Sequence, residues 1–451
     1  MNKDTLTASN GVDVNSYFTG KKITVMGLGL LGRGVGDAYF LASRGAKLTI
    51  TDLKSKEELR DSLDRLAQFP DIEYVLGEHR LEDFEGKDFI LKAAGVPLDS
   101  EYVAHAVSSG VPIKMSATWF MELSGIKTIG VTGTRGKSTT TYMIFDALKE
   151  AGVPVVLGGN IRGVSTLALL DEVTPEHTAV LELDSWQCQG FRDSQRGPLV
   201  SVFTTFFPDH LNYYKDDLDV YLADKAGLFL YQSETDTLVL GAQAAPVVLE
   251  HYGEKIEAKI QIGDEHTFPE ELALMVPGEH NRYDAGLALL ALRAYGLPDE
   301  ESLRALALFT GAPGRLELVR EVDGVRYYND TNATTPEATI AALKALSVPG
   351  RMNVALIMGG ADKGLSLDTL LELIPDYTRH VSLLKGTGTE RTKEVLFEAS
   401  EFDSLKEAFE DARSHVGPGD IVLMSPAFAS FGMFNNEYDR GDQFNALVNA
   451  L

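Results

Sequence analysis

The sequence predicts an α/β protein built from three domains. Its 451 residues exceed what one hydrophobic core usually supports and suit about three domains. Three blocks each open with a β-branched run that ends in glycine and continues into a helical pattern. Strands that alternate with helices in this way are typical of parallel α/β sheets. We place the domains at residues 1–115, 116–312 and 313–451.

Composition and charge narrow the class of protein. Hydrophobic residues make up 44% and charged residues 24%, which is usual for a folded chain. The net charge of −25 argues against a protein that binds nucleic acid or membrane surfaces, because binding to anionic phosphates requires an excess of Lys and Arg. Cys188 is the single cysteine, so an internal disulfide and a cysteine-based zinc site are excluded.

The chain carries no sign of targeting to a membrane. The first 22 residues lack the apolar core of a signal peptide, and no apolar run is long enough to span a bilayer. We therefore expect a cytoplasmic protein, and we expect it to act as a monomer.

The first block predicts a Rossmann-like domain. It begins with KITVMGLGLLGRG (22–34), continues through a strand that ends at Asp52, and closes after the strand DFILKAAG (88–95). The segment GLGLLG (27–32), with Asp52 about twenty residues later, fits a dinucleotide-binding fingerprint. That fingerprint is unspecific on its own, so an NAD-dependent oxidoreductase stays open as a distant alternative.

The second block predicts a P-loop ATPase-type domain. KTIGVTGTRGKSTTTYMIFDALKEAG (127–152) runs from a strand through a glycine-rich turn into a long amphipathic helix. Two more strands are predicted at TAVLELDS (178–185) and LVSVFTT (199–205), and a helix at 281–295.

The turn in this block has the chemistry of a phosphate-binding loop. Backbone N–H groups at a helix N-terminus converge on an anion, Lys137 offers charge to the β- and γ-phosphates, and the Ser138 hydroxyl suits Mg²⁺. Val131 stands where a Walker A loop ordinarily has its first glycine, so this loop is a shortened variant. We expect ATP and Mg²⁺ as cofactors, with ATP held by Gly133, Thr134, Arg135, Gly136, Lys137, Ser138 and Thr139.

The third block predicts a second Rossmann-like domain. It opens with a hairpin at 316–330, whose Asp323-Gly324 pair suits a type I′ turn. Strands are predicted at 353–360, 380–386 and 420–427, with helices between them.

The shortened loop resembles that of the Mur ligases and the folylpolyglutamate synthetases. Other motifs follow in order along nearly the whole chain: GGNI (158–161), LELDSWQ (181–187), PDHLNYY (208–214), YLADKAGLF (221–229), GRLE (314–317), YNDTNATTPEAT (328–339), GGADKG (359–364) and SPAFASF (425–431). Together they resemble the D-glutamate-adding branch of the Mur ligase family. The resemblance implies an ATP-dependent ligase that joins D-glutamate to UDP-N-acetylmuramoyl-L-alanine through an acyl phosphate, in peptidoglycan precursor synthesis.

The resemblance also assigns catalytic roles. It implies that Glu182 and His210 bind Mg²⁺ together with Ser138, while Lys137 contacts the phosphates. Lys225 resembles a lysine that the family carbamylates with CO₂, which would turn it into a further metal ligand. From the residues alone, Lys225 would be an ordinary solvated lysine on a helix.

The remaining site residues come from the resemblance too. Arg315 and Asp330 would contact the nucleotide, and Thr334, Lys363 and Ser430 would hold the incoming glutamate. The residues expected around the UDP-sugar substrate are Gly27, Gly29, Leu30, Leu31, Asp52, Lys54, Gly95, Asn160 and Gln187.

Departures from the family pattern leave alternatives open. Asn332 stands where many relatives have lysine, Asp184 replaces a common serine, and Ala93 falls where a serine is frequent. The stretch TTFFPDH (204–210) lacks the asparagine usual before PDH. A ligase that adds another amino acid, such as L-glutamate, stays open, as do a folylpolyglutamate synthetase-like ligase and a non-catalytic nucleotide-binding scaffold.

Overall fold

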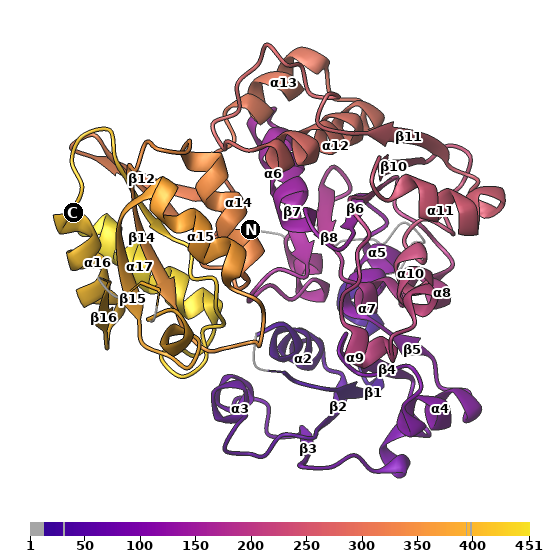
Figure 1. The fold of residues 1–451 in the computed structure, drawn as a ribbon. Coiled ribbons are helices and arrows are strands. Elements are labelled where there is room, and N and C mark those ends of the chain that lie inside the picture. The colour runs from indigo at the N-terminus through magenta and orange to yellow at the C-terminus, as the bar shows by residue number, and fades with distance from the viewer. Residues whose placement is uncertain (1–12, 30–31, 394, 397–398) are drawn as a thin grey trace. The chain divides into compact units, whose positions relative to one another are not determined.

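The computed structural model describes residues 13–29, 32–393, 395–396 and 399–451, and Figure 1 labels most of their helices and strands. These residues form three β-sheets. The chain divides into two compact units, one within Met1–Thr267 and Gly286–Leu303 and the other within Phe268–Ala285 and Arg304–Leu451. Among the described residues, every helix is too short or too polar to cross a membrane.

The first sheet has five parallel strands in the order β3-β2-β1-β4-β5. Its strands are β1 (Lys22–Met26), β2 (Lys47–Asp52), β3 (Glu73–Leu76), β4 (Phe89–Lys92) and β5 (Ile113–Lys114). The accompanying helices are α1 (Val14–Tyr17), α2 (Arg33–Ser43), α3 (Arg60–Leu66) and α4 (Glu101–Ser108). The strands predicted at residue 22 and before Asp52 are confirmed, whereas β3 and β5 are too short to give a readable sequence pattern.

The second sheet has six parallel strands in the order β11-β10-β9-β6-β8-β7. Its strands are β6 (Lys127–Thr132), β7 (Val155–Gly159), β8 (Thr178–Glu182), β9 (Val200–Phe203), β10 (Thr237–Gly241) and β11 (Lys259–Gly263). Its helices are α6 (Lys137–Glu150), α7 (Ser185–Cys188), α8 (Phe191–Ser194), α9 (Leu211–Tyr214), α10 (Leu218–Ala226) and α11 (Ala245–Tyr252). Helices cover parallel sheets, so every residue of β8 and β9 is buried.

The strand order of this second sheet determines which loops become neighbours. β6 pairs with β8 on one side and with β9 on the other, and Val131 lies opposite Glu182. Because all three strands are parallel, the segments that follow them emerge at the same edge of the sheet. The phosphate loop, Glu182 and the Thr204-Thr205 pair are therefore adjacent, although about 70 residues separate the first from the last.

The third sheet has six strands in the order β12-β13-β17-β14-β15-β16 and is parallel except for the first pair. Its strands are β12 (Glu317–Val322), β13 (Val325–Asn329), β14 (Val354–Gly359), β15 (Thr378–Leu384), β16 (Ser400–Phe402) and β17 (Ile421–Met424). The predicted hairpin turn is confirmed, because Asp323 and Gly324 have φ values of 52° and 78°, as a type I′ turn requires.

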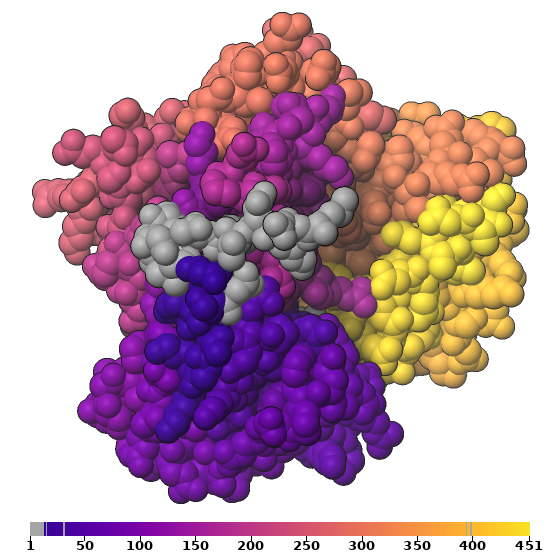
Figure 2. Space-filling view, turned by 180° about the vertical axis from the view of Figure 1, so that it is seen from behind, coloured from indigo at the N-terminus to yellow at the C-terminus, as the bar shows by residue number. Residues whose placement is uncertain are grey.

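Four helices accompany the third sheet, and two more precede it in the chain. They are α12 (Glu279–Tyr295), α13 (Asp299–Ala307), α14 (Pro336–Leu346), α15 (Asp368–Tyr377), α16 (Leu405–Ser414) and α17 (Glu437–Asn449). The helix predicted at 281–295 is confirmed as α12. In the space-filling view the yellow C-terminal segment, which includes α17, lies at the molecular surface (Figure 2).

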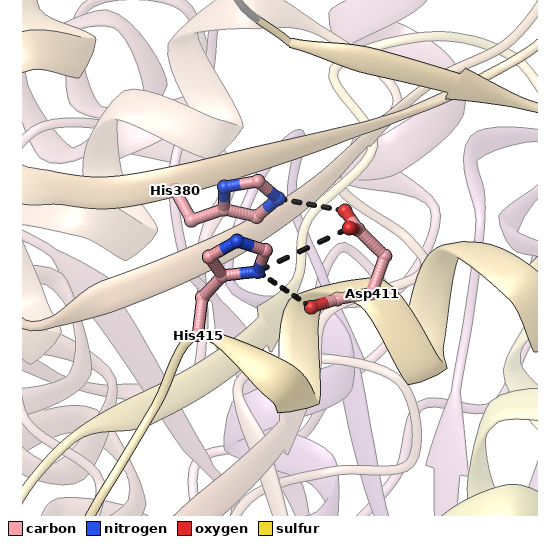
Figure 3. A group of neighbouring side chains, drawn as sticks. All are labelled: His380, Asp411 and His415. Atoms are coloured by element: carbon pink, nitrogen blue, oxygen red, sulfur yellow. Dashed lines mark hydrogen bonds and ion pairs between the residues drawn. The ribbon is translucent and has the colours of Figure 1, made fainter.

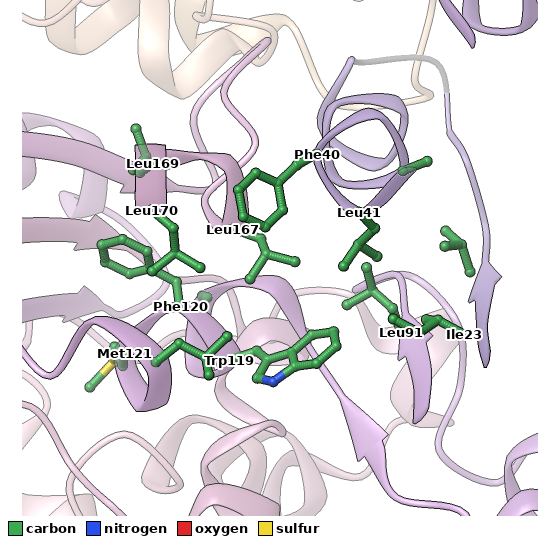
Figure 4. Packing of buried hydrophobic residues seen from close by; sticks show 14 of the residues in the cluster. Ile23, Phe40, Leu41, Leu91, Trp119, Phe120, Met121, Leu167, Leu169 and Leu170 are labelled. Atoms are coloured by element: carbon green, nitrogen blue, oxygen red, sulfur yellow. The ribbon is translucent and has the colours of Figure 1, made fainter. Parts of the chain in front are cut away.

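One hydrophobic cluster joins the first two sheets into a single unit (Figure 4). Helix α5 (Ser116–Ser124) follows the first sheet directly and contributes Trp119, Phe120 and Met121. These side chains belong to the same cluster as Ile23 of β1 and Leu167 of the second sheet's domain. The connection between the two sheets is therefore not a flexible linker, because the side chains of α5 pack into the apolar cluster that both sheets share.

Trp119→Ala should strongly destabilise this unit. Trp119 is fully buried, and truncating a buried Trp removes about 3 to 5 kcal/mol from the free energy of unfolding. Urea denaturation followed by circular dichroism measures the change. Val107→Ala serves as the control, because Val107 is 63% exposed on α4 and should cost less than about 0.5 kcal/mol. Similar losses in both variants would contradict the packing described.

Candidate functional site

The phosphate loop connects the end of β6 to the start of α6, as predicted. Gly136 precedes α6 with a φ of 84°, and Gly133 has a φ of 139°, both in a region that L-residues with side chains avoid. A Cβ atom on Gly133 would clash with the Thr204 hydroxyl. Glycine is therefore required where the loop passes closest to the neighbouring strand.

Two threonines that follow β9 brace the loop. The Thr204 hydroxyl donates to the Arg135 carbonyl at 2.6 Å, and the Arg135 N–H donates to the Thr205 hydroxyl at 2.9 Å. The Thr134 N–H also donates to the Thr205 carbonyl at 2.7 Å. Thr204 and Thr205 occupy the stretch that lacks the family's asparagine, and their role was not predicted. The sequence feature that could have indicated this role is their position directly after a buried strand that pairs with β6.

Lysine side chains lie on both sides of the loop. The Lys137 ammonium donates to the Thr134 carbonyl at 3.1 Å, and the Lys225 ammonium donates to the Gly133 carbonyl at 2.8 Å. Lys225 is only 1% exposed, and its Nζ lies 4.7 Å from the centre of the Tyr221 ring. Burial, together with repulsion from Lys137, lowers the pKa of Lys225 to about 7. The expectation of a solvated lysine was wrong, because α10 packs this face against the loop.

Glu182 ends β8 beside the loop and is buried. Its Oε1 accepts a hydrogen bond from the Asn160 amide at 3.1 Å, and its backbone carbonyl accepts from the Asn160 N–H at 2.6 Å. The Asn160 side-chain oxygen in turn accepts from Arg33, which lies at the start of α2. Asn160 thus links the carboxylate to the first domain and fixes its orientation.

Aromatic contacts hold His210 near the phosphate loop. It has a left-handed backbone, with a φ of 53°, immediately before α9. Its ring centre is 4.8 Å from that of Trp186 and 6.3 Å from that of Tyr221. The Tyr221 hydroxyl lies 3.3 Å from the hydroxyl of Thr134 in the loop. His210 itself is partly exposed, so its imidazole is accessible to a ligand.

The donor set at this edge fits a hard divalent cation. Ser138, the second residue of α6, offers a hydroxyl oxygen, and Glu182 adds a carboxylate at the end of β8. Mg²⁺ prefers such oxygen ligands and keeps several waters. Lys225 fits a cation only after its amine has been converted into an acidic group, and its low pKa favours that conversion because the neutral amine is the nucleophile.

A cavity of about 720 Å³ lies between the first sheet and the second sheet's domain within one compact unit. Predicted UDP-site residues that line it are Gly27, Gly29, Asp52, Lys54, Gly95 and Gln187. Gly159, the neighbour of Asn160, lines it as well. Leu30 and Leu31 lie outside the described residues. The size suits a ligand as large as a nucleotide sugar.

The geometry of Asp52 argues against the dinucleotide alternative. Its Oδ2 accepts hydrogen bonds from the N–H groups of Leu28 at 2.8 Å and Gly29 at 3.2 Å, and its Oδ1 accepts from the Lys54 N–H at 2.9 Å. In a dinucleotide-binding domain the corresponding carboxylate binds the ribose hydroxyls. Here its two oxygens hold the loops at the ends of β1 and β2, so Asp52 shapes the cavity.

Two charged residues of this cavity were missed by sequence reasoning. The buried Lys92 ammonium donates to the Val96 carbonyl at 2.8 Å, and burial lowers its pKa to about 8. Asp37 accepts from Ser116 at 2.8 Å and from Ser165 at 2.5 Å, and burial raises its pKa to about 6. Neither residue belongs to a recognisable motif. Asp37 acts through contacts distant in sequence, and Lys92 also donates to the distant Gln189 side chain at 3.4 Å.

The other compact unit brings the predicted amino-acid-binding residues together. The Lys363 ammonium donates to the Thr334 hydroxyl at 2.8 Å. Ala361 and Ala429 exchange backbone hydrogen bonds, which joins the Lys363 loop to the segment that carries the buried Ser430. Thr334, Lys363 and Ser430 thus lie on neighbouring loops at the carboxyl ends of the strands.

The two predicted nucleotide residues of this unit differ in exposure. Arg315 is exposed, whereas Asp330 is buried and accepts from the Ser425 hydroxyl at 2.8 Å and the Leu316 N–H at 3.1 Å. Burial raises the pKa of Asp330 to about 7. Asp330 therefore holds the Arg315 segment through the backbone of Leu316.

Two departures from the family pattern have local structural roles. Asp184 caps α7, where its carboxylate accepts from the Gln187 N–H at 2.7 Å and the Gln187 side chain accepts from the Asp184 N–H at 3.1 Å. Asn332 donates to the Pro313 carbonyl at 3.3 Å, which fastens the segment before Arg315. The side chains of Asp184 and Asn332 therefore stabilise the local backbone and do not disrupt the candidate site.

Three family models match: the Mur ligase MurD-like N-terminal domain over residues 21–115, the Mur ligase middle domain over 131–268, and the Mur ligase glutamate ligase domain over 314–428. The chain belongs to the Mur ligase family. The first-domain match favours a Mur ligase over a folylpolyglutamate synthetase, which was not expected to keep a complete domain there. The boundaries at 115 and 312 stay predictions.

Similar proteins align with almost the whole length of this Mur ligase. The UDP-N-acetylmuramoylalanine--D-glutamate ligase of Roseiflexus sp. (strain RS-1) is 37% identical, over 96% of this chain and 99% of the relative. The enzyme of the same name from Borreliella burgdorferi (strain ATCC 35210) is 36% identical, over 95% and 97%. The UDP-N-acetylmuramate-alanine ligase MurC of Thermotoga maritima has a similar fold, with a TM-score of 0.59 at 17% identity over 95% and 99%.

Gly133→Ala should weaken nucleotide binding. The added Cβ clashes with Thr204 and forces the loop away from its braced conformation, at a cost of about 1 to 3 kcal/mol. Isothermal titration with a non-hydrolysable ATP analogue should show a Kd raised about 10-fold or more. Gly152→Ala is the matched control, since Gly152 also has a positive φ, 75°, but open space around its Cβ position. Equal Kd values for both variants and wild type would contradict the role of the loop.

Proposed function

We propose that this Mur ligase joins D-glutamate to UDP-N-acetylmuramoyl-L-alanine at the expense of ATP, in the synthesis of peptidoglycan precursors. The observation that carries the proposal is the braced phosphate loop with Glu182 and the buried Lys225 beside it. The names of the full-length relatives support the choice of amino acid and acceptor.

The loop supplies the chemistry of phosphoryl transfer. ATP binds with its β- and γ-phosphates against the N–H groups of the loop and the N-terminus of α6, where Lys137 neutralises developing charge. An oxygen of the acceptor carboxylate attacks the γ-phosphorus, the bond to ADP breaks, and an acyl phosphate forms. The D-glutamate amine then attacks the acyl carbon, phosphate leaves, and the amine loses its proton. Positioning and charge neutralisation supply most of the acceleration.

The metal requirement follows from the same residues. Ser138, Glu182 and His210 would hold Mg²⁺, with Lys225 as a further ligand once carbamylated. The ion supplies charge neutralisation for the phosphate oxygens. Asn160 keeps the Glu182 carboxylate oriented for this role, and Thr204 and Thr205 keep the loop in place.

The two substrates bind through different elements. The cavity of the first unit would take the UDP portion, with Gly27, Gly29 and Gly95 allowing close approach and Lys54 offering charge to the diphosphate. Thr334, Lys363 and Ser430 would hold the carboxylates of D-glutamate. Arg315 would contact the nucleotide, with Asp330 positioning its segment.

Lys137→Ala should lower turnover about 10²- to 10³-fold, because it removes one preorganised charge from the transition state. ADP release is measured with UDP-N-acetylmuramoyl-L-alanine and Mg²⁺, comparing D-glutamate, L-glutamate and other amino acids. Lys149→Ala is the control, because Lys149 is exposed at the other end of α6. Faster turnover with L-glutamate than with D-glutamate would identify a different ligase. ADP release absent with every muramoyl acceptor would refute the proposal.

Carbamylation of Lys225 should follow its lowered pKa. Only the neutral amine reacts with CO₂, and the carbamate forms with release of a proton. At constant dissolved CO₂ the carbamate should therefore rise most steeply below about pH 7, where the amine must also lose its own proton, and less steeply above, until the lysine is fully carbamylated. ¹³C NMR at constant dissolved ¹³CO₂ measures the carbamate signal, and Lys225→Met identifies it. A signal that rises only near the ordinary lysine pKa of about 10.4, or one that survives in Lys225→Met, would contradict the assignment.

A further inference from the structure

Two histidines and an aspartate form a compact cluster in the unit that carries the third sheet (Figure 3). His380 lies on β15, Asp411 lies on α16, and His415 follows the last turn of that helix. One ligand atom from each residue lies within 4.8 Å of the others. Among the described residues, this is the one group of three potential metal ligands of these types. Neither the sequence motifs nor the family resemblance predicted it.

The three side chains are held close together by hydrogen bonds and ring stacking. His380 Nε2 lies 2.6 Å from Asp411 Oδ2, and His415 Nδ1 lies 2.8 Å from the Asp411 carbonyl oxygen and 3.9 Å from its Oδ1. The imidazole rings stack with centres 3.6 Å apart and planes 5° apart. The Ser382 hydroxyl donates to Asp411 Oδ2 at 2.7 Å, which fixes the carboxylate. The three potential ligands are therefore neighbours before any ion binds, and an ion would replace the hydrogen bond between His380 and Asp411.

The cluster is separate from the residues proposed to hold the amino acid. In the register of the third sheet, His380 lies opposite Ala355, whereas Leu384 lies opposite Gly359, which begins the Lys363 loop. Four strand residues correspond to roughly 13 Å along the strand. The C-terminal end of α16 lies at this same end, because α16 connects β16 to the parallel strand β17.

We propose that His380, Asp411 and His415 bind one divalent transition-metal ion, with Zn²⁺ as the expected ion. Two imidazole nitrogens and one carboxylate are a ligand set typical of zinc, with a fourth position left for water. Imidazole also favours Zn²⁺ over Mg²⁺, so this site differs in metal preference from the one at the phosphate loop. His415 is exposed, which gives the ion access from solvent.

The charges of the cluster suit a cation. Burial raises the pKa of Asp411, but hydrogen bonds from Ser382 and His380 outweigh it and leave that pKa below its ordinary value, so the carboxylate is ionised. Stacked imidazoles this close repel one another when both are protonated. A metal ion in place of the proton between His380 and Asp411 joins β15 to α16 and stabilises the unit, since the ligands are assembled only in the folded chain.

The test uses full-length chain without a histidine tag. Equilibrium dialysis against Zn²⁺ in excess Mg²⁺, followed by elemental analysis, should give one tightly bound zinc per chain. His380→Ala and His415→Ala should each lower the affinity at least about 10-fold and remove the rise in Tm that Zn²⁺ causes. In the Cu²⁺-loaded protein, electron paramagnetic resonance should show coupling to two nitrogens in wild type and to fewer in either variant.

His251→Ala is the matched control. His251 resembles His415, because its Nδ1 lies 2.9 Å from the Val247 carbonyl four residues earlier and its Nε2 lies 3.5 Å from Asp219. In the part of the chain that the structure describes, His251 belongs to no group of three potential metal ligands, so its loss should leave zinc binding unchanged. His415 is exposed, and circular dichroism should show a folded variant. Zinc uptake that is absent, or that stays unchanged in His380→Ala and His415→Ala, would overturn the proposal.

Discussion

The parallel pairing of β6 with β8 and β9 is the constraint on which the candidate site depends. It aligns Val131 with Glu182 and Thr132 with Phe203, so the segments after three strands leave the sheet at one edge. The phosphate loop, the carboxylate and the two bracing threonines come from distant parts of the sequence but share this edge. A change of register in any one strand would separate them.

Close packing at this edge explains the unusual residues found there. Gly133 passes so near Thr204 that a side chain has no space, and Lys225 loses its water because α10 covers the loop. The cost of burying an ammonium group appears as a pKa lowered to about 7. The same burial makes the amine reactive near neutral pH, so a feature that is unfavourable for stability favours the proposed modification.

Local patterns allowed much of the fold to be predicted. Glycine-punctuated β-branched runs predicted the main strands, Asp323-Gly324 predicted the hairpin, and GTRGKST predicted the loop before α6. Short strands such as β5, with 2 residues, carry too little pattern to be recognised. The order of strands within each sheet depends on contacts between distant residues, which periodicity does not report.

The candidate site could be predicted from the residues alone only where the functional residues form one continuous sequence motif. Lys137 and Ser138 follow from the loop itself, whereas Lys225 and His210 depended on the family resemblance. Thr204, Thr205, Lys92 and the Asp411 cluster each have partners far away in the chain, such as Gln189 for Lys92, so single residues gave no signal. Asp52 lines the cavity where the UDP-sugar substrate is predicted, but its hydrogen bonds to the loop backbone depend on the fold and could not be predicted from the fingerprint.

The central claim is that the loop at this edge transfers a phosphoryl group from ATP to a substrate carboxylate. It is tested most directly by supplying UDP-N-acetylmuramoyl-L-alanine with both carboxylate oxygens labelled with ¹⁸O, together with ATP, Mg²⁺ and D-glutamate. Mass analysis of the released phosphate should find one ¹⁸O atom in each, because the acyl phosphate breaks between carbon and the bridging oxygen. Phosphate without the label, alongside formation of the amide, would contradict the account.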